Sequence, residues 1–137
     1  MLGLVGVGLY ASTRYLDARG RPEGLEDLDA HTLIVGESGT DAQDFARAHG
    51  VDADRLAFRL RTDNHHARFS AMRAGAGITA CHHWHAARMP EAERVLAMVE
   101  VTRLPVFLVA HDDLPRSRRL RAVFGFLQTR LKEAVRD

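Results

Sequence analysis

One strand–helix–strand pattern near the middle of the chain constrains the fold more than any other feature. Apolar and polar residues alternate over residues 56–61 and then give way to Thr62-Asp63-Asn64, which favour the start of a helix. A helical pattern follows over residues 64–74, Gly75 ends it, and a second apolar run covers residues 76–81. We predict two parallel strands joined by this helix. Ligands of open α/β sheets bind where such a helix begins, because its free N–H groups face the sheet edge.

The rest of the chain continues this alternation of strands and helices, which predicts a largely parallel sheet of the α/β class. Further strands are predicted at residues 3–11, 32–35 and 106–111, an extended segment at 94–101, and helices at 12–18, 25–28, 40–48, 83–88 and 116–135. Gly3, Gly6 and Gly8 in the first strand indicate close packing against its backbone.

Composition indicates an ordinary globular protein. A chain of 137 residues suits one compact domain or two small lobes, and its net charge of +1 gives no general attraction to nucleic acid or membranes. The single Cys81 excludes an internal disulfide and fits a reducing cytosol. The apolar residues 1–9 are too few to span a bilayer and lack the basic region of a signal peptide. We therefore expect a cytoplasmic protein with no membrane partner.

Three segments resemble the effector-binding domain of LysR-type transcriptional regulators. They are, in chain order, Val7-Gly8-Leu9-Tyr10-Ala11-Ser12 with the residues up to His31, the Thr62-Asp63-Asn64 cap with its helix and Ala74-Gly75-Ala76-Gly77-Ile78, and Val106-Phe107-Leu108-Val109-Ala110-His111-Asp112-Asp113-Leu114 with the helix that follows. The resemblance spans nearly the whole chain and keeps the family's order. It implies an α/β lobe like those of periplasmic binding proteins, with a mostly parallel sheet, plus a partial second lobe made of a closing strand and the C-terminal helix.

The resemblance also implies a division of the chain. Residues 1–11 would be a strand that crosses between lobes, residues 12–101 the second lobe, and residues 102–137 a C-terminal remnant of the first lobe. The rest of the first lobe and the winged helix-turn-helix would lie upstream of Met1 and are expected to be absent. The predicted helix at 116–135 would then have no sheet to cover its apolar side, so we expect it to pack on a second copy of the chain or to be loosely held. That apolar side consists of Leu120, Val123, Phe124, Leu127 and Leu131.

The predicted binding site lies on the loops that leave the sheet. By resemblance, the effector would contact Tyr10, Gly36, Glu37, Ser38, Thr62 and Asn64. From the residues alone, helix capping is enough to explain Thr62-Asp63-Asn64, and a bound ligand is an addition to that role. Glu37 departs from the family pattern. An acidic side chain in the cleft would disfavour a carboxylate effector and favour a polar or cationic one. We predict no catalytic residue, no metal and no cofactor.

The run Cys81-His82-His83-Trp84-His85 supports an alternative interpretation, a small metal-dependent α/β enzyme that uses Cys81, His82, His83 and His85. Consecutive strand residues alternate between faces, so at most two of these side chains can converge on one ion. We prefer a buried Cys81 with surface histidines around a packed Trp84. A third interpretation is a stand-alone solute-binding or interaction domain whose exposed C-terminal strand recruits a partner.

The sequence therefore favours an effector-sensing module of a LysR-family regulator over an enzyme. A small molecule between the lobes would bind one relative orientation more tightly than another, and a homo-oligomer would couple that difference to transcription. Contact with DNA would require the absent N-terminal domain.

Overall fold

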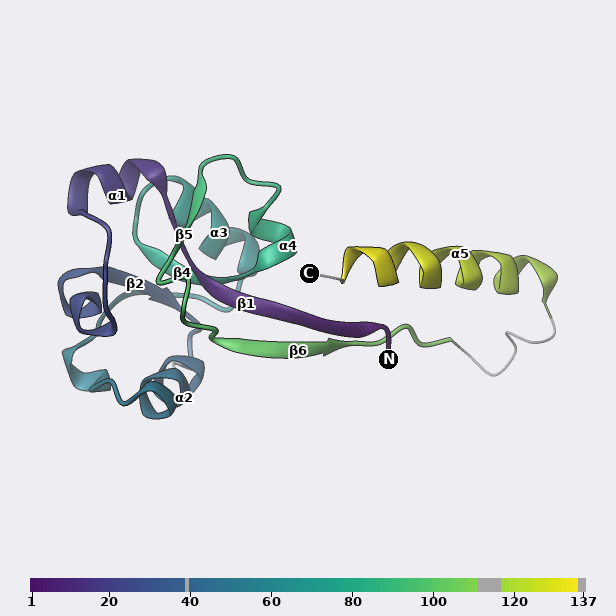
Figure 1. Cartoon of the computed structure of the whole chain (residues 1–137), viewed down its shortest axis with the longest axis horizontal. Helices are drawn as coiled ribbons and strands as arrows, with labels where there is room; N and C mark the ends of the chain where they lie inside the picture. Colours follow the sequence, from purple (N-terminus) through teal and green to yellow (C-terminus); the bar gives the residue numbers. More distant parts are fainter. Residues whose placement is uncertain (39, 111–116, 136–137) are drawn as a thin grey trace.

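A computed structural model describes residues 1–38, 40–110 and 117–135 (Figure 1). Its strands are β1 (Gly3–Ser12), β2 (Thr32–Val35), β3 (Ala57–Arg61), β4 (Ile78–His82), β5 (Ala92–Val95) and β6 (Thr102–Val106). Its helices are α1 (Thr13–Arg19), α2 (Thr40–His49), α3 (His65–Arg73), α4 (His83–Ala86) and α5 (Arg118–Ala134), with 3-10 turns η1 (Leu25–Ala30) and η2 (Ala53–Arg55).

The strands form one sheet in the order β3-β2-β4-β1-β5, with β6 also paired to β1. β2 runs parallel to both β3 and β4, whereas β1 is antiparallel to β4, β5 and β6. Every described strand except β1 therefore points the same way. The mostly parallel α/β fold is confirmed, and so is the parallel direction of the two strands joined through α3.

β1 belongs to two parts of the molecule. Val7 pairs with His82 of β4 and with Thr102 of β6, so β4 and β6 lie on opposite edges of β1. The strand then continues beyond the end of β4, where Gly3–Val7 pairs with Thr102–Val106. We call these two segments the β1/β6 arm; Figure 1 shows the arm extending from the lobe towards the N-terminus.

Helices cover both faces of the sheet, because neighbouring residues of each strand point to opposite sides. Leu9 and Leu33 face a core that includes Leu16 of α1 and Ala46 of α2. Tyr10 and Ile34, next along their strands, face a second core that includes Met72 of α3 and Ala86 of α4. The lobe is thus a sheet between two helical layers, and α3 lies against the face that carries Tyr10.

The Ala74-Gly75-Ala76-Gly77-Ile78 motif has a geometric cause. Gly75 ends α3 with φ +88°, a left-handed conformation that favours glycine. A side chain on Gly77 would collide with the carbonyl of Thr32 at the start of β2. The two glycines allow the chain to leave α3 and enter β4 directly beside β2.

Two predictions in the C-terminal third are wrong. Residues 94–101 are not one extended segment, because β5 ends at Val95 and the chain turns at Leu96, which has φ +49°. The last strand is β6, Thr102–Val106, rather than residues 106–111; residues 107–110 have no regular structure and His111 lies outside the described residues. Pro105 lies within β6, an edge strand where a missing N–H is tolerated.

α5 projects from the lobe. No residue of this helix is buried, and Leu120, Val123 and Leu127 are 51%, 55% and 38% exposed. Figure 1 shows α5 beyond the lobe, with its C-terminal end returning towards the arm, where Val135 Cγ2 lies 3.2 Å from the place of a Cβ on Gly3. The predicted helix is confirmed in kind, although it begins after Ser117 rather than at Arg116, which lies outside the described residues.

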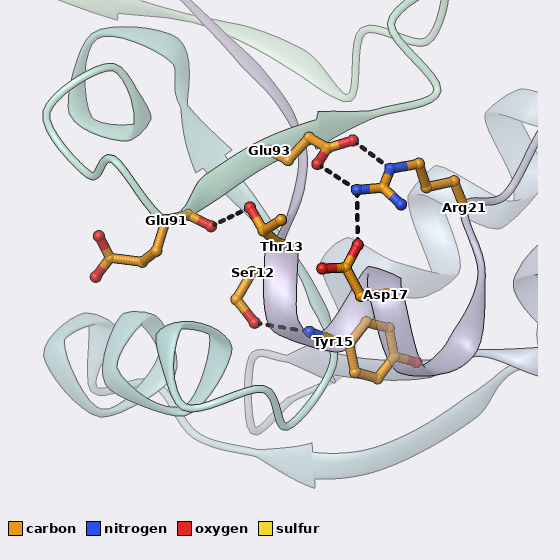
Figure 2. A network of polar contacts seen from close by, with 7 residues as sticks. All are labelled: Ser12, Thr13, Tyr15, Asp17, Arg21, Glu91 and Glu93. Carbon is orange, nitrogen blue, oxygen red and sulfur yellow. Dashed lines mark hydrogen bonds and ion pairs between the residues drawn. The ribbon is translucent and has the colours of Figure 1, made fainter.

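Polar contacts fasten α1 to the strand end and to β5 (Figure 2). Ser12 caps α1 by accepting the Tyr15 N–H at 3.3 Å. The N–H and hydroxyl of Thr13 donate to the carbonyl of Glu91 at 2.9 and 3.4 Å. The start of α1 is thereby tied to the residue that precedes β5.

Arg21 links Asp17 of α1 to Glu93 of β5, as Figure 2 shows. Its Nε and Nη2 donate to the two carboxylate oxygens of Glu93 at 2.6 and 2.9 Å, and Nη2 also donates to Asp17 at 3.1 Å. The hydrogen bonds from Arg21 lower the pKa of the Glu93 carboxyl.

This pKa shift predicts an acid-dependent loss of stability. Glu93 has a lower pKa in the folded chain than its ordinary 4.5, so its stabilisation is present above that value and is lost as pH falls through the folded pKa. Urea unfolding at about pH 6 and about pH 3 should show a smaller acid-dependent loss in Arg21→Gln than in the parent chain. Arg47→Gln is the control, since it removes only a local ion pair within α2. Equal acid dependence in the parent and Arg21→Gln would contradict the assignment.

Candidate functional site

The carboxyl ends of three parallel strands meet at one edge of the sheet, which we call the carboxyl edge. β2 is followed by Gly36, Glu37 and Ser38, β3 by Thr62 and Asp63, and β4 by His83. Because β2 lies between β3 and β4, the two predicted loops are neighbours. This is the position where α/β sheets of this kind bind their ligands.

Asp63 joins the two loops. Its Oδ1 accepts the Glu37 N–H at 2.7 Å, a hydrogen bond between residues 26 apart in sequence. A Cβ on Gly36 would lie 3.2 Å from this carboxylate oxygen and 3.4 Å from Nη2 of Arg68. The glycine therefore leaves just enough room for an acid and a base to approach the loop.

The start of α3 is capped as the sequence predicts. Asn64 Oδ1 accepts the Ala67 N–H at 3.1 Å, and Thr62 Oγ1 accepts the Asn64 N–H at 3.2 Å. The Thr62 N–H donates to the carbonyl of Val35 at 3.0 Å, which continues the β2–β3 contact to the strand ends. These bonds hold the α3 N-terminus at the carboxyl edge with its partial positive charge directed there.

Arg68 is a site residue that the sequence prediction missed. The residue is only 9% exposed, and its Nη2 donates to the carbonyl of Thr62 at 3.1 Å. Its Nε is buried and has no hydrogen-bond acceptor among the described residues. Helical spacing offered a signal: Arg68 lies four residues before the fully buried Met72 and therefore shares its sheet-facing side.

Tyr10 occupies a different place from the other predicted site residues. Glu37, Ser38 and Asn64 are exposed on the loops, whereas Tyr10 is buried beneath α4 in the second core. Its hydroxyl forms a 2.7 Å hydrogen bond with Nδ1 of His83. Tyr10 thus contacts the β4 side of the carboxyl edge and is paired with a histidine that the sequence prediction had assigned only to the alternative metal site.

His83 lies in a slot on β1. Gly6 and Gly8 are two residues apart and face the same side of the strand. A Cβ on Gly6 would lie 2.6 Å from His83 Cδ2, and one on Gly8 would lie 2.6 Å from His83 Cε1. Only glycine at both positions admits the imidazole, which confirms the close packing predicted for this strand.

The proposed metal site is not formed. Among the described residues, no group of three or more His, Cys, Asp or Glu side chains is arranged to hold a metal ion. Burial raises the pKa of the Cys81 thiol to about 11, which disfavours the thiolate that binds metals. Burial, and then the neighbouring His65, His85 and His83, lower the pKa of His82. The metal-dependent enzyme therefore has no support.

At the carboxyl edge, the side chains of Glu37, Ser38 and Asn64 are exposed. Two surface depressions lie elsewhere, and neither is lined by a predicted site residue. One, of about 240 Å³, lies between α1 and the turn before β4, and the other, of about 310 Å³, lies between η1 and the end of α2.

The fold is an α/β lobe of the periplasmic-binding-protein type. The model of the LysR substrate-binding domain family matches residues 3–132. The chain therefore belongs to this family, the effector-sensing part of LysR-type transcriptional regulators. No helix among the described residues is long and apolar enough to cross a membrane.

Solved structures share the fold. The regulatory domain of CrgA from Neisseria meningitidis is 20% identical with a TM-score of 0.72, and the match covers 95% of this chain and 66% of that domain. For the regulatory domain of AphB from Vibrio vulnificus the identity is 19% and the TM-score 0.59, with coverage of 94% and 65%. This chain thus spans about two thirds of each regulatory domain. Curated protein sequences show no match.

The Asp63–Glu37 bond makes a testable prediction about the two loops. Asp63→Ala should remove the acceptor of the Glu37 N–H and lower the protection of the Gly36 and Glu37 amides from hydrogen exchange by about two- to tenfold. Asp52→Ala is the matched control, because the Asp52 carboxylate accepts the N–H of Asp54, which is only two residues away. If Asp63→Ala changed no amide in the β2 loop, the two loops would be independent.

Proposed function

We propose that this chain binds a small-molecule effector at the carboxyl edge, between the loops after β2 and β3 and the N-terminus of α3. The hydrogen bond from the Glu37 N–H to Asp63 carries this proposal, because it fixes the two loops relative to each other at the end of a helix dipole. The predicted contact residues are Gly36, Glu37, Ser38, Thr62 and Asn64, with Tyr10 at the adjoining β4 side. Arg68 holds the loop after β3 in place by donating to the carbonyl of Thr62.

The charge at this edge favours a polar or cationic effector over a carboxylate. Glu37 is exposed at the mouth of the site, while Asp63 is engaged with the β2 loop. Arg68 supplies a positive charge, but it is buried and directed at the carbonyl of Thr62. Among Glu37, Asp63 and Arg68, the accessible side-chain charge is therefore negative.

The arm supports the division of the chain proposed from the family pattern. Residues 1–11 would carry the crossing strand, residues 12–101 the second lobe, and residues 102–137 the returning part of the first lobe. β1 and β6 leave the lobe together from the carboxyl edge, as two crossing strands of a binding-protein fold would. An effector held at that edge would lie between the lobes and favour one orientation of the arm.

In a cell, the chain would act as a non-catalytic cytoplasmic sensor. Relatives are described as transcriptional regulators, so the effector-dependent change would be transmitted to DNA by a winged helix-turn-helix joined to the same regulator. Such a sensor would transform no substrate, because its effect comes from a difference in effector affinity between two conformations.

Binding at the loops predicts a distinct mutational pattern. In titrations with a panel of amino acids, polyamines and short dicarboxylates, an effector should shift the amide signals of residues 36–38 and 62–65 together. Thr62→Ala should weaken its binding by about two- to tenfold, the effect of one lost hydrogen bond, and more than His83→Ala does. Glu37→Gln should weaken a cationic ligand and spare a neutral one. A stronger effect of His83→Ala would move the site to the histidines.

We propose further that the apolar side of α5 associates with a second copy of the chain. Leu120, Val123 and Leu127 are exposed in the single chain, and burying apolar area stabilises association by about 25 cal/mol per Å². Strand β6 and the free part of β1 would join the same contact through their unpaired edges.

Sedimentation tests this association. The parent chain should sediment as an oligomer at micromolar concentration, and Val123→Gln with Leu127→Gln should shift it to monomer. Arg118→Gln with Thr129→Gln is the matched control, because these positions lie on the opposite side of α5. A compact monomer whose amides at residues 120–131 are strongly protected from exchange would contradict the proposal.

A further inference from the structure

His83 lies where three parts of the chain meet. It is the first residue of α4, at the end of β4, and its ring fills the glycine slot on β1. On one side its Nδ1 is bonded to the hydroxyl of Tyr10 at 2.7 Å. On the other side, Nε2 lies 3.8 Å from Oε1 of Glu100, two residues before β6 begins.

The Nε2 atom of His83 is incompletely satisfied. It is buried, and it has no hydrogen-bond partner among the described residues. At 3.8 Å the Glu100 carboxylate is too far for a hydrogen bond but close enough for a charge interaction. A buried polar atom without a partner costs free energy, so a small movement of Glu100 towards Nε2 would be favourable.

Protonation changes what this ring can bind. The neutral ring carries one N–H, either on Nδ1 facing Tyr10 or on Nε2 facing Glu100, so it can donate to one side only. In the imidazolium both nitrogens donate, one to the Tyr10 oxygen and the other towards Glu100, and the second contact gains the attraction of opposite charges. The protonated ring would thus connect β1 directly to the segment that leads into β6.

Other charged groups around His83 oppose or share this interaction. Arg94 of β5 lies over Gly8 beside the ring, with its Nε 3.1 Å from the place of a Cβ there. Arg103 of β6 donates to Glu100 at 3.3 Å. His82 is held towards its neutral form by burial and by neighbouring histidines, which lower its pKa. Among the described groups named here, Glu100 is the one anion that faces the ring.

We infer that His83 is a positioning residue that holds the β1/β6 arm to the lobe, through Tyr10 and Glu100, more firmly when its ring is protonated. The imidazolium donates to Tyr10 and towards Glu100 at once, whereas the neutral ring has a single N–H and lacks the charge attraction to Glu100. This inference rests on the proposed function only for its consequence, that effector affinity depends on pH through the contact of the arm with the lobe. The arm itself and its contacts are present without any effector.

Hydrogen exchange of the arm amides tests the inference. After correction for intrinsic rates, the amides of Gly3–Val7 and Thr102–Val106 should be about threefold more protected at about pH 5.5 than at about pH 8, the size expected for one partly exposed ion pair. His83→Gln, which cannot take up a proton, should abolish this pH dependence. Glu100→Gln should abolish it as well while keeping the Tyr10 contact, so the result stands even if His83→Gln folds poorly.

His85→Gln is the matched control, since it removes a neighbouring histidine of α4 and should retain the pH dependence. Equal protection of the parent chain at both pH values would overturn the inference, as would an unchanged pH dependence in Glu100→Gln. A purely structural role would lower protection equally at both values. Effector titrations of residues 36–38 and 62–65 report separately on the proposed function, so either proposal can be rejected without the other.

Discussion

The structure depends on the double pairing of β1. This one strand hydrogen-bonds to β4 on one edge and to β5 and β6 on the other, and it runs against all three. Its C-terminal half lies at the centre of the lobe, where Leu9 packs in the first core and Tyr10 in the second. Its N-terminal half leaves the lobe at the carboxyl edge. Any force on the arm is therefore transmitted along β1 into both cores.

The same strand explains the arrangement of the candidate site. Because β1 is antiparallel to its neighbours, it leaves the sheet at the edge where β2, β3 and β4 end. The capped start of α3, the Asp63–Glu37 bond and His83 are all located at that edge. The loops after β2 and β3 and the arm therefore leave the sheet at the same edge, with β4 between them, as a result of strand direction.

The arm and α5 expose apolar side chains, whereas the lobe buries them. The lobe buries its apolar residues between two helical layers, whereas Leu4, Leu104 and Phe107 of the arm region are exposed, as is much of α5. An amphipathic helix without a covered side contributes little to its own stability, because most helical stability in proteins comes from tertiary packing. This contrast makes the C-terminal third the natural place for association.

Sequence alone determined the elements whose local chemistry and periodicity agree. Strand β2 was predicted to the residue, and the cap of α3 within Thr62-Asp63-Asn64 and the stop at Gly75 followed from turn chemistry. Tertiary structure decided the rest. Arg68 became a site residue and His83 a partner of β1 only through contacts across the sheet, and the edge position of β6 made Pro105 acceptable within a strand. Local pattern records which residues favour a helix or strand, but strand order and direction bring distant side chains together, and these are fixed by packing.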